Sequence, residues 1–257
     1  MKRGQIGGRL KNSRIRLYND DCLACLPALK ADCVDLVLVD PPYGKTALHW
    51  DVELSFEDLW AALRHVCSNG PWVFTAVQPF TTQLISSNLA DFRYTLVWDK
   101  GRGSNPLLAN KRPMQSHEDI VVFYKKQPVY NPQMTVGTPY SVPATGGNRN
   151  NAIVGAVQDR PGWRQATKDT SKRFPLSILK YSIHCGSKLQ PTQKPVALME
   201  WLVRTFTNKG AVVLDCCMGA GTTGVAALQA GRRFIGVEIN PKNFQIAKQR
   251  IESVPCL

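Results

Sequence analysis

The chain of 257 residues is 44% hydrophobic and has a formal net charge of +13. This length suits one large α/β domain with insertions. No apolar run approaches the roughly 18 residues that a membrane span requires, and the basic N-terminus lacks the apolar core of a signal peptide. We therefore expect a soluble, cytoplasmic protein with no membrane partner, and not a secreted or membrane protein.

Two cysteines with C-x-x-C spacing, Cys22 and Cys25, follow a first predicted strand at residues 15–18. This spacing occurs in redox dithiols and in half of many zinc sites. A zinc site needs two further closely spaced ligands, for which His184-Cys185 is the one candidate. We predict instead that both cysteines lie on the apolar face of a short helix and that the protein has no metal site.

The tetrapeptide Asp40-Pro41-Pro42-Tyr43 directly follows an apolar strand predicted at residues 34–39. The two prolines force extended backbone and donate no N–H, so the Asp40 carboxylate and the neighbouring carbonyl remain as acceptors. Tyr43 adds a flat face for stacking. These groups favour chemistry on a planar ring that carries an amine; an ordinary strand-to-loop turn is the alternative.

The middle of the chain combines further sheet elements with most of the positive charge. A helix is predicted at 56–67, and strands at 72–77, 96–98 and 120–124. Residues 101–190 hold 13 Lys or Arg and four Asp or Glu, with Gly, Asn, Pro and aromatic residues between them. This composition suits a phosphate backbone and its bases, whereas a basic surface without a partner is the alternative.

A nucleotide-binding βαβ pattern lies near the C-terminus. Residues 219–224 spell G-x-G-x-x-G between predicted strands at 211–214 and 234–237, with a helix at 225–230 and Glu238 ending the second strand. Such glycines let the backbone approach a ligand, and the acid can accept hydrogen bonds from ribose hydroxyls. Taken alone, the pattern also fits an NAD-type oxidoreductase.

The position of this pattern predicts the fold. After Glu238 there is room for one more helix, so the other strands must come from the N-terminal half. We predict a doubly wound, mostly parallel α/β sheet, in which Asp40 and Gly219 face one crevice beyond the carboxyl ends of the strands. Residues 191–195 precede a helix at 196–207 and offer N–H groups and a Thr hydroxyl; a plain helix cap is the alternative there.

With these elements the chain resembles, over nearly its whole length, the DNA amino-methyltransferases of the β arrangement, the adenine-N6 and cytosine-N4 enzymes. In that family the catalytic Asp-Pro-Pro-Tyr comes first, the target-recognition segment second and the S-adenosylmethionine loop last, an order similar to residues 40–43, 101–190 and 215–221 here. The resemblance extends to Thr-Gln-Lys-Pro at 192–195 and to phage and prophage members. It implies a circularly permuted, Rossmann-like methyltransferase sheet in a single domain, 1–257, with an irregular target-recognition insertion at 101–190.

The resemblance implies site-specific methyl transfer from S-adenosylmethionine to adenine N6 in double-stranded DNA by base flipping, in a bacterial or phage-infected host cell and typically in restriction-modification. Asp40 and Pro41 accept the two amine N–H bonds, Pro42 fixes the loop, and Tyr43 stacks on the flipped base. The cofactor contacts implied by position are Asp21 for the adenine edge, Glu238 for the ribose, Asp215, Gly219 and Gly221 for the loop, Thr192 and Lys194 near the methionine end, and Pro195, Cys217 and Thr222 beside them.

Several alternatives stay open at this point. Asp at the first motif position favours adenine, but N4-cytosine methylation uses the same chemistry. The family usually has Pro-Phe after the loop aspartate, where this chain has Cys216-Cys217, so a catalytically impaired DNA-binding relative is an alternative. RNA or a protein glutamine as acceptor, and a homodimer, are further alternatives. A carbon-5 cytosine enzyme is rejected, because the one Pro-Cys pair, Pro255-Cys256, lies in the C-terminal tail.

Overall fold

The computed structural model describes residues 14–42, 55–104, 106–142, 167–183 and 193–255. The chain divides into two compact units. One comprises Met1–Asn131 and Leu176–Leu257, and the other comprises Pro132–Pro175. The sequence-predicted core elements lie in the first unit.

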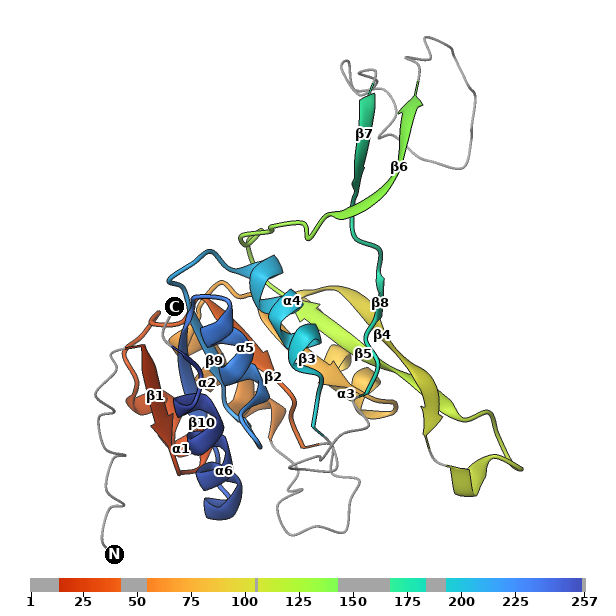
Figure 1. The fold of residues 1–257 in the computed structure, drawn as a ribbon. Coiled ribbons are helices and arrows are strands. Elements are labelled where there is room, and N and C mark those ends of the chain that lie inside the picture. Colours follow the sequence, from red (N-terminus) through yellow and green to blue (C-terminus); the bar gives the residue numbers. More distant parts are fainter. Residues whose placement is uncertain (1–13, 43–54, 105, 143–166, 184–192, 256–257) are drawn as a thin grey trace, which may run out of the picture. The chain divides into compact units, whose positions relative to one another are not determined.

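The first unit is built on an eight-stranded sheet (Figure 1). Counted along the sheet in the order given below, the first five strands pair in parallel. The sixth strand, β5, is antiparallel to both of its neighbours, and the seventh and eighth strands pair in parallel. The predicted mostly parallel, doubly wound sheet is thereby confirmed. The strand order is β1 (Ile15–Tyr18), β10 (Arg233–Val237), β9 (Val212–Asp215), β2 (Leu36–Val39), β3 (Trp72–Ala76), β5 (Gln115–Phe123), β4 (Phe92–Ser104) and β8 (Ile178–Lys180).

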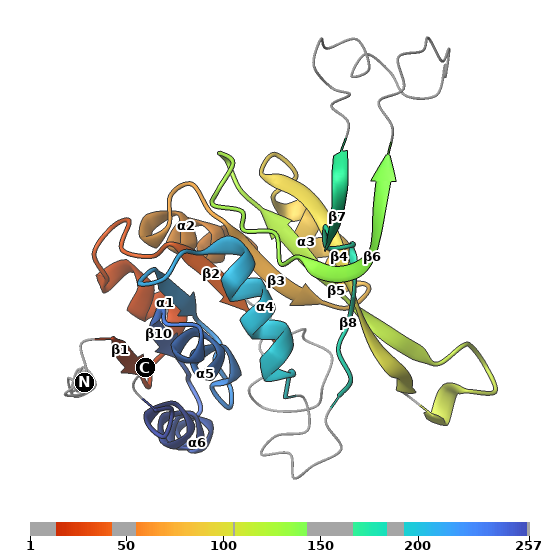
Figure 2. The ribbon, with the colours of Figure 1, turned by 45° about the horizontal axis from the view of Figure 1, so that its top comes forward.

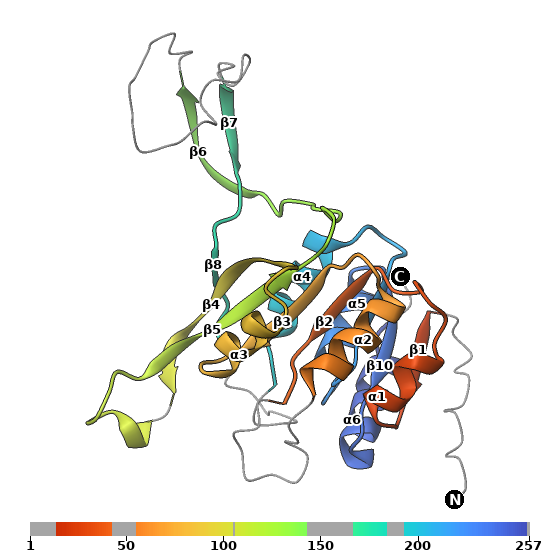
Figure 3. The ribbon, with the colours of Figure 1, turned by 180° about the vertical axis from the view of Figure 1, so that it is seen from behind.

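Helices cover both faces of this sheet. Figure 1 shows one set in front of the strands, Figure 2 shows the same layer tilted forward, and Figure 3 shows the other set from behind. The front set is α4 (Val196–Phe206), α5 (Thr222–Gln229) and α6 (Pro241–Glu252), and the rear set is α1 (Cys22–Cys25), α2 (Phe56–Val66) and α3 (Phe80–Ser87). Short 3₁₀ turns, η1 (Leu26–Ala28) and η2 (Pro106–Leu108), complete the described elements of this unit.

The alternation of side chains along β2 explains why this strand reads as a continuous apolar run. Leu36 and Leu38 pack into the core that includes α4, α5 and α6, whereas Val37 and Val39 pack into the core that includes α1, α2 and α3. Successive side chains of a strand point to opposite faces, so a strand covered on both sides needs apolar residues at every position. The run therefore places its final residue, and Asp40 after it, at the carboxyl edge of a buried strand.

The second unit contains a two-stranded antiparallel sheet. Its strands are β6 (Thr135–Val142) and β7 (Thr167–Arg173), with Thr135 opposite Arg173 and Val142 opposite Thr167. The sequence analysis treated this region as loops. The strand β7 contains no apolar residue, and β6 contains Gly137 and Pro139, which are unfavourable within a strand, so neither was recognised from the sequence.

The glycine at position 224 is a packing requirement of this fold. A Cβ added there would lie 2.6 Å from Ile251 Cδ1 and 2.7 Å from Phe234 Cε1. We expect Gly224→Ala to lower the free energy of unfolding by about 1–3 kcal/mol, as overpacking does elsewhere. Urea unfolding measures this loss. The double variant Gly224→Ala/Ile251→Val removes the nearer methyl group and should lose less than the sum of its parts; strict additivity would contradict the clash.

Candidate active site

Asp40 lies at the carboxyl edge of β2 and is held by two neighbouring side chains. The Thr75 hydroxyl, from the adjacent strand β3, donates to Oδ1, and Lys194 Nζ donates to Oδ2 at 2.8 Å. Thr75 is fully buried and the Lys194 side chain is 7% exposed, whereas the Asp40 side chain keeps 26% of its surface exposed. The carboxylate is therefore fixed in orientation and still accessible from outside.

Lys194 extends this contact into a chain of alternating charges. Its Nζ also lies 3.3 Å from Glu118 Oε2, and Lys100 Nζ donates to Glu118 Oε1 at 2.9 Å. Lys100 and Glu118 reach the same face of the sheet because Glu118 is opposite Trp98, two residues before Lys100. Two acids and two lysines thus form a partly buried network whose formal charges cancel. The sequence analysis assigned no role to Glu118 and missed Thr75 and Lys100.

The remaining residues of the Asp-Pro-Pro-Tyr motif are only partly described. Pro41 is buried and Pro42 is half-buried, while Tyr43 lies outside the described residues. Thr192 also lies outside them. Pro195 was expected in the first turn of its helix; it is instead the N-cap of α4, one position earlier.

Two further acids, Asp215 and Glu238, lie at the same edge of the sheet as Asp40. Asp215 ends β9, which pairs with β2, and Glu238 follows β10, which pairs with β9. Because parallel strands end at one edge, Asp40, Asp215 and the glycine loop after β9 share that edge, as the sequence predicted.

Glu238 is buried and fixes the glycine loop. Its Oε2 accepts from the Gly219 N–H at 2.9 Å, and its Oε1 accepts from the Asn240 N–H at 2.8 Å. Burial raises the pKa of this carboxyl above its usual range. Each carboxylate oxygen has two acceptor positions, so lone pairs remain for the two hydroxyls of a ribose.

The glycines of the loop differ in what they do. Gly219 and Gly221 both have left-handed backbone, with φ of 52° and 75°. A Cβ at Gly221 would lie 2.9 Å from Ile251 Cδ1 and 3.0 Å from Ala247 Cβ, both in α6. The missing side chains of Gly221 and Gly224 are therefore explained by packing within the protein, and a role of Gly221 in ligand contact stays a prediction. The Thr222 hydroxyl accepts from Arg250 at 3.3 Å.

Asp21 follows β1, the neighbour of β10, and its carboxylate already has a structural role. It accepts from the Leu23 N–H at 2.8 Å and so caps α1, while Asp20 accepts from the Asp21 N–H at 2.9 Å. Both side chains are exposed, and neither capping bond uses all the acceptor positions of a carboxylate. The contact of Asp21 with an adenine edge remains a prediction.

Asp215 is completely buried, and this burial raises its pKa to about 7. The Thr223 hydroxyl and the Cys217 N–H, at 3.1 Å from Oδ1, oppose the rise, and the negative charges of Asp40 and Glu238 add to it. A cation bound beside Asp215 would favour its charged form.

This buried carboxyl leads to a prediction for Asp215→Asn. The proton leaves the unfolded chain near pH 4 but leaves the folded protein near pH 7, so this group makes stability fall as pH rises across that window. The amide carries no charge, so we expect the variant to gain about 1–3 kcal/mol over the natural protein above pH 7 and less near pH 4. Urea unfolding at both pH values tests this. A variant equally destabilised at both would contradict it.

Three cysteine thiols gather beside these acids. The sulfur atoms of Cys22, Cys216 and Cys217 all lie within 4.8 Å of one another. Cys22 thus lies close to the cysteines after β9, a proximity that the C-x-x-C spacing of Cys22 and Cys25 does not indicate. Hydrogen bonds from the thiols of Cys216 and Cys217 lower the pKa of Cys22 to about 4.

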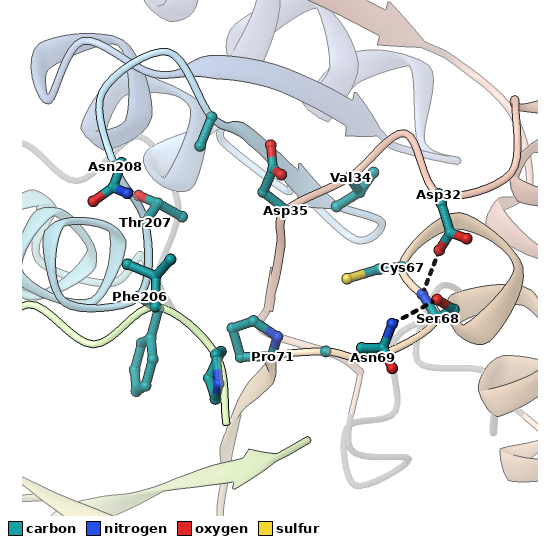
Figure 4. Close-up of a pocket in the computed structure, with 14 residues that line it drawn as sticks. Asp32, Val34, Asp35, Cys67, Ser68, Asn69, Pro71, Phe206, Thr207 and Asn208 are labelled. Atoms are coloured by element: carbon teal, nitrogen blue, oxygen red, sulfur yellow. Dashed lines mark hydrogen bonds between the residues drawn. The ribbon is translucent and has the colours of Figure 1, made fainter. Parts of the chain in front are cut away.

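A cleft of about 300 Å³ opens elsewhere in the first unit (Figure 4). Asp35 precedes β2 and Pro71 precedes β3, so this cleft lies at the amino ends of the strands. None of the sequence-predicted site residues lines it. Asp32 in its wall accepts from the Ser68 N–H at 2.8 Å, a bond that ties two loops together. The cleft is therefore separate from the edge where the acids meet.

A comparison with protein families identifies the family of this chain. The family model of the N6/N4 DNA methylases matches residues 34–249. The protein belongs to this family. Membership confirms the expected cofactor, S-adenosylmethionine, and favours the DNA methyltransferase prediction over the NAD oxidoreductase. No helix among the described residues is long and apolar enough to cross a membrane.

Individual relatives agree with the family assignment. The chain is 27% identical over 265 residues to the DNA adenine methyltransferase YhdJ of Escherichia coli, covering 98% of this chain and 87% of that one. The M1.HpyAVI–SAM complex is 25% identical with a TM-score of 0.59, covering 92% of this methylase and 99% of that chain. The cytosine-N4-specific PvuII DNA methyltransferase, at 15% identity and a TM-score of 0.64, shares the fold over 93% of this chain and 86% of that one.

The residues at this edge fit S-adenosylmethionine. The ligand's adenine amine, ribose hydroxyls, sulfonium and ammonium group need acceptors or anions, whereas its carboxylate needs donors. Asp21, Glu238 and Asp215 supply the acceptors at the ends of three adjacent strands. Gln193, next to Lys194, has a buried Oε1 without a hydrogen-bond partner among the described atoms.

Proposed function

We propose that this methylase transfers the methyl group of S-adenosylmethionine to N6 of adenine at specific sites in double-stranded DNA, with the target base turned out of the helix. The observation that carries the proposal is the Asp40 carboxylate. It is held by Thr75 and Lys194 at the same edge as the acids suited to the cofactor, and it keeps an exposed surface.

The chemistry required of the protein is positioning of the amine. The N6 lone pair is delocalised into the adenine ring, so the nitrogen is a poor nucleophile until the lone pair is localised. Hydrogen bonds from the two N–H groups to the Asp40 carboxylate and the Pro41 carbonyl draw the nitrogen towards a tetrahedral shape. Thr75 and Lys194 prevent the carboxylate from rotating, so the acceptor is oriented before the base arrives.

The cofactor supplies an activated methyl group. With the cofactor bound, the amine would bond to its methyl carbon as the carbon–sulfur bond breaks, and the bonding electron pair would leave on sulfur. The amine then loses one proton along its hydrogen bond to Asp40, whose exposed side gives it to water. Asp215 would contribute negative charge towards the cationic sulfonium of the bound cofactor. Tyr43, by the resemblance, stacks on the flipped base and offsets part of the cost of flipping, a few kcal/mol.

The choice of adenine rests on two points. By resemblance, Asp at the first motif position favours adenine, since cytosine-N4 enzymes more often carry Ser there. YhdJ, which is similar over nearly the whole chain, is named a DNA adenine methyltransferase.

The segment between β4 and β5 supports DNA as the substrate. β4 runs in the direction of β3, so this segment extends from the carboxyl edge at which Asp40 lies. Lys111 and Arg112 in it are exposed. Lys125 and Lys126 are also exposed but follow β5, whose end pairs with the start of β3 at the opposite edge.

This difference leads to a prediction with a matched control. We expect Lys111→Gln/Arg112→Gln to weaken DNA binding and to reduce the slope of log affinity against log salt concentration by about 2, one for each lost phosphate contact. Lys125→Gln/Lys126→Gln removes the same charge from the opposite edge and should leave the slope unchanged. Fluorescence anisotropy with labelled duplex DNA measures both. Equal losses in the two variants would show that only net charge matters.

The proposal is tested by transfer of labelled methyl from S-adenosylmethionine to double-stranded DNA, single-stranded DNA, RNA and protein in parallel. We expect label in double-stranded DNA. Label confined to RNA or protein would overturn the choice of acceptor. Cofactor binding without label on any acceptor would favour the non-catalytic relative.

A further inference from the structure

The cluster of Cys22, Cys216 and Cys217, at the carboxyl edge of the strands, is built from distant parts of the chain. Cys22 begins α1, the helix that follows β1, while Cys216 and Cys217 follow β9, with β10 between those two strands. Cys22 and Cys216 are buried and Cys217 is half-buried. All three are free thiols. The methyl transfer described above uses none of these sulfur atoms.

We infer that Cys22, Cys216 and Cys217 form a three-thiolate site for a soft or borderline d¹⁰ metal ion of the zinc class. The sulfur atoms already lie within 4.8 Å of one another. Tetrahedral coordination with zinc–sulfur bonds of about 2.3 Å needs sulfur–sulfur separations of about 3.8 Å. The upper limit of 4.8 Å on the present separations exceeds that spacing by only about 1 Å.

The surroundings of the cluster also suit a cation. Asp215 directly precedes Cys216, and the charges of Asp215 and Glu238 act on the thiols of Cys216 and Cys22. Without a metal ion the thiols of Cys216 and Cys217 keep their protons, because hydrogen bonding to the Cys22 sulfur and burial raise their pKa values. A divalent ion replaces the thiol protons, which are released to solvent, and compensates the negative charge of the thiolates. Three protein ligands leave a fourth position for water.

Cadmium is a suitable probe, because cadmium–thiolate bonds give an ultraviolet charge-transfer band and cadmium takes the same ligands as zinc. The full chain, stripped of metal and kept reduced with a phosphine, is titrated with Cd²⁺. We expect the band to saturate at one equivalent. Loss of a residue that only hydrogen-bonds to a metal ligand weakens metal binding about 10–100-fold. Loss of a direct ligand should cost more, so Cys22→Ser and Cys217→Ser should each weaken Cd²⁺ binding about 100-fold or more.

Matched controls separate this site from other thiols. Cys25→Ser tests the C-x-x-C pairing, and Cys33→Ser removes a half-buried thiol outside the cluster; both should bind Cd²⁺ as the natural protein does. Circular dichroism shows that each variant is folded, and Cys217→Ser keeps the test valid if substitution at the buried Cys22 disrupts folding. A folded, reduced protein without the band would overturn the inference, as would equal loss of binding in Cys25→Ser. Either result is independent of methyl transfer.

Discussion

Replacing Asp40 by Asn is expected to lower kcat for methyl transfer by at least about 10³-fold, the range in which enzymes lose activity when a preorganised hydrogen-bonding group is removed. The amide is the same size and can still accept from Thr75. Its NH₂ group, however, faces the Lys194 ammonium group, so two hydrogen-bond donors point at each other. The same NH₂ group offers the adenine amine a donor in place of an acceptor. The variant should therefore fold and bind cofactor but fail in the chemical step.

Single-turnover transfer from labelled S-adenosylmethionine measures this loss, and isothermal titration measures cofactor binding in the same sample. Asp58→Asn, in the exposed first turn of α2, is the matched control and should keep full activity. Retention of more than about a tenth of the natural kcat by Asp40→Asn would contradict the role assigned to the carboxylate, because a group that orients the amine is worth far more.

Replacing Lys194 by Met is expected to reduce both stability and activity. The change leaves the Asp40 and Glu118 carboxylates without the cation between them. Breaking a buried ion pair costs about 3–5 kcal/mol, and we expect about 2–4 kcal/mol here because Asp40 is partly exposed. Activity should fall as well, because Asp40 loses the contact that fixes Oδ2.

A second variant separates the two effects. Lys194→Met/Glu118→Gln also removes the second carboxylate that Lys194 contacts, which returns the formal charge of the network to zero, and the amide oxygen can still accept from Lys100, so urea unfolding should show part of the lost stability restored. Methyl transfer should remain low, because Asp40 still lacks its partner. If activity returned together with stability, Lys194 would have a purely structural role.

The parts of the fold that could be predicted are those whose signal is local. The apolar run of β2 and the motif after it placed Asp40 correctly, because a strand buried on both faces has no other pattern. The helices α2 and α4 begin and end within one residue of the predicted bounds. The C-x-x-C segment forms the predicted short helix α1 with both cysteines buried.

Other elements depend on partners that a single sequence does not show. β4 spans Phe92–Ser104, although only residues 96–98 were predicted; pairing with β5 at Asp99 and again at Ser104 extends the strand past the charged residues and glycines between them. The helix α3 was missed, since it begins after Pro79 without a side-chain cap. β8 has three residues and no alternation to detect.

The same limit applies to the site. The sequence indicated Asp40 and Lys194 separately, but their ion pair joins residues 154 positions apart. Lys100 and Thr75 carry no motif, and only the register of β4, β5 and β3 brings them to the network. For the cysteines, the sequence correctly predicted a helix with Cys22 and Cys25 buried, but only the order of the strands in the sheet places Cys22 beside Cys216 and Cys217.

The central claim, that the Asp40 carboxylate directs methylation to adenine N6, is tested most directly by nucleoside analysis of DNA after reaction with labelled S-adenosylmethionine. Natural protein and Asp40→Asn are compared on the same unmethylated duplex DNA, digested to nucleosides and separated by chromatography with mass detection. We predict label in N6-methyladenine alone with the natural protein and none with the variant. Label in N4-methylcytosine, or N6-methyladenine formed equally well by the variant, would contradict the account.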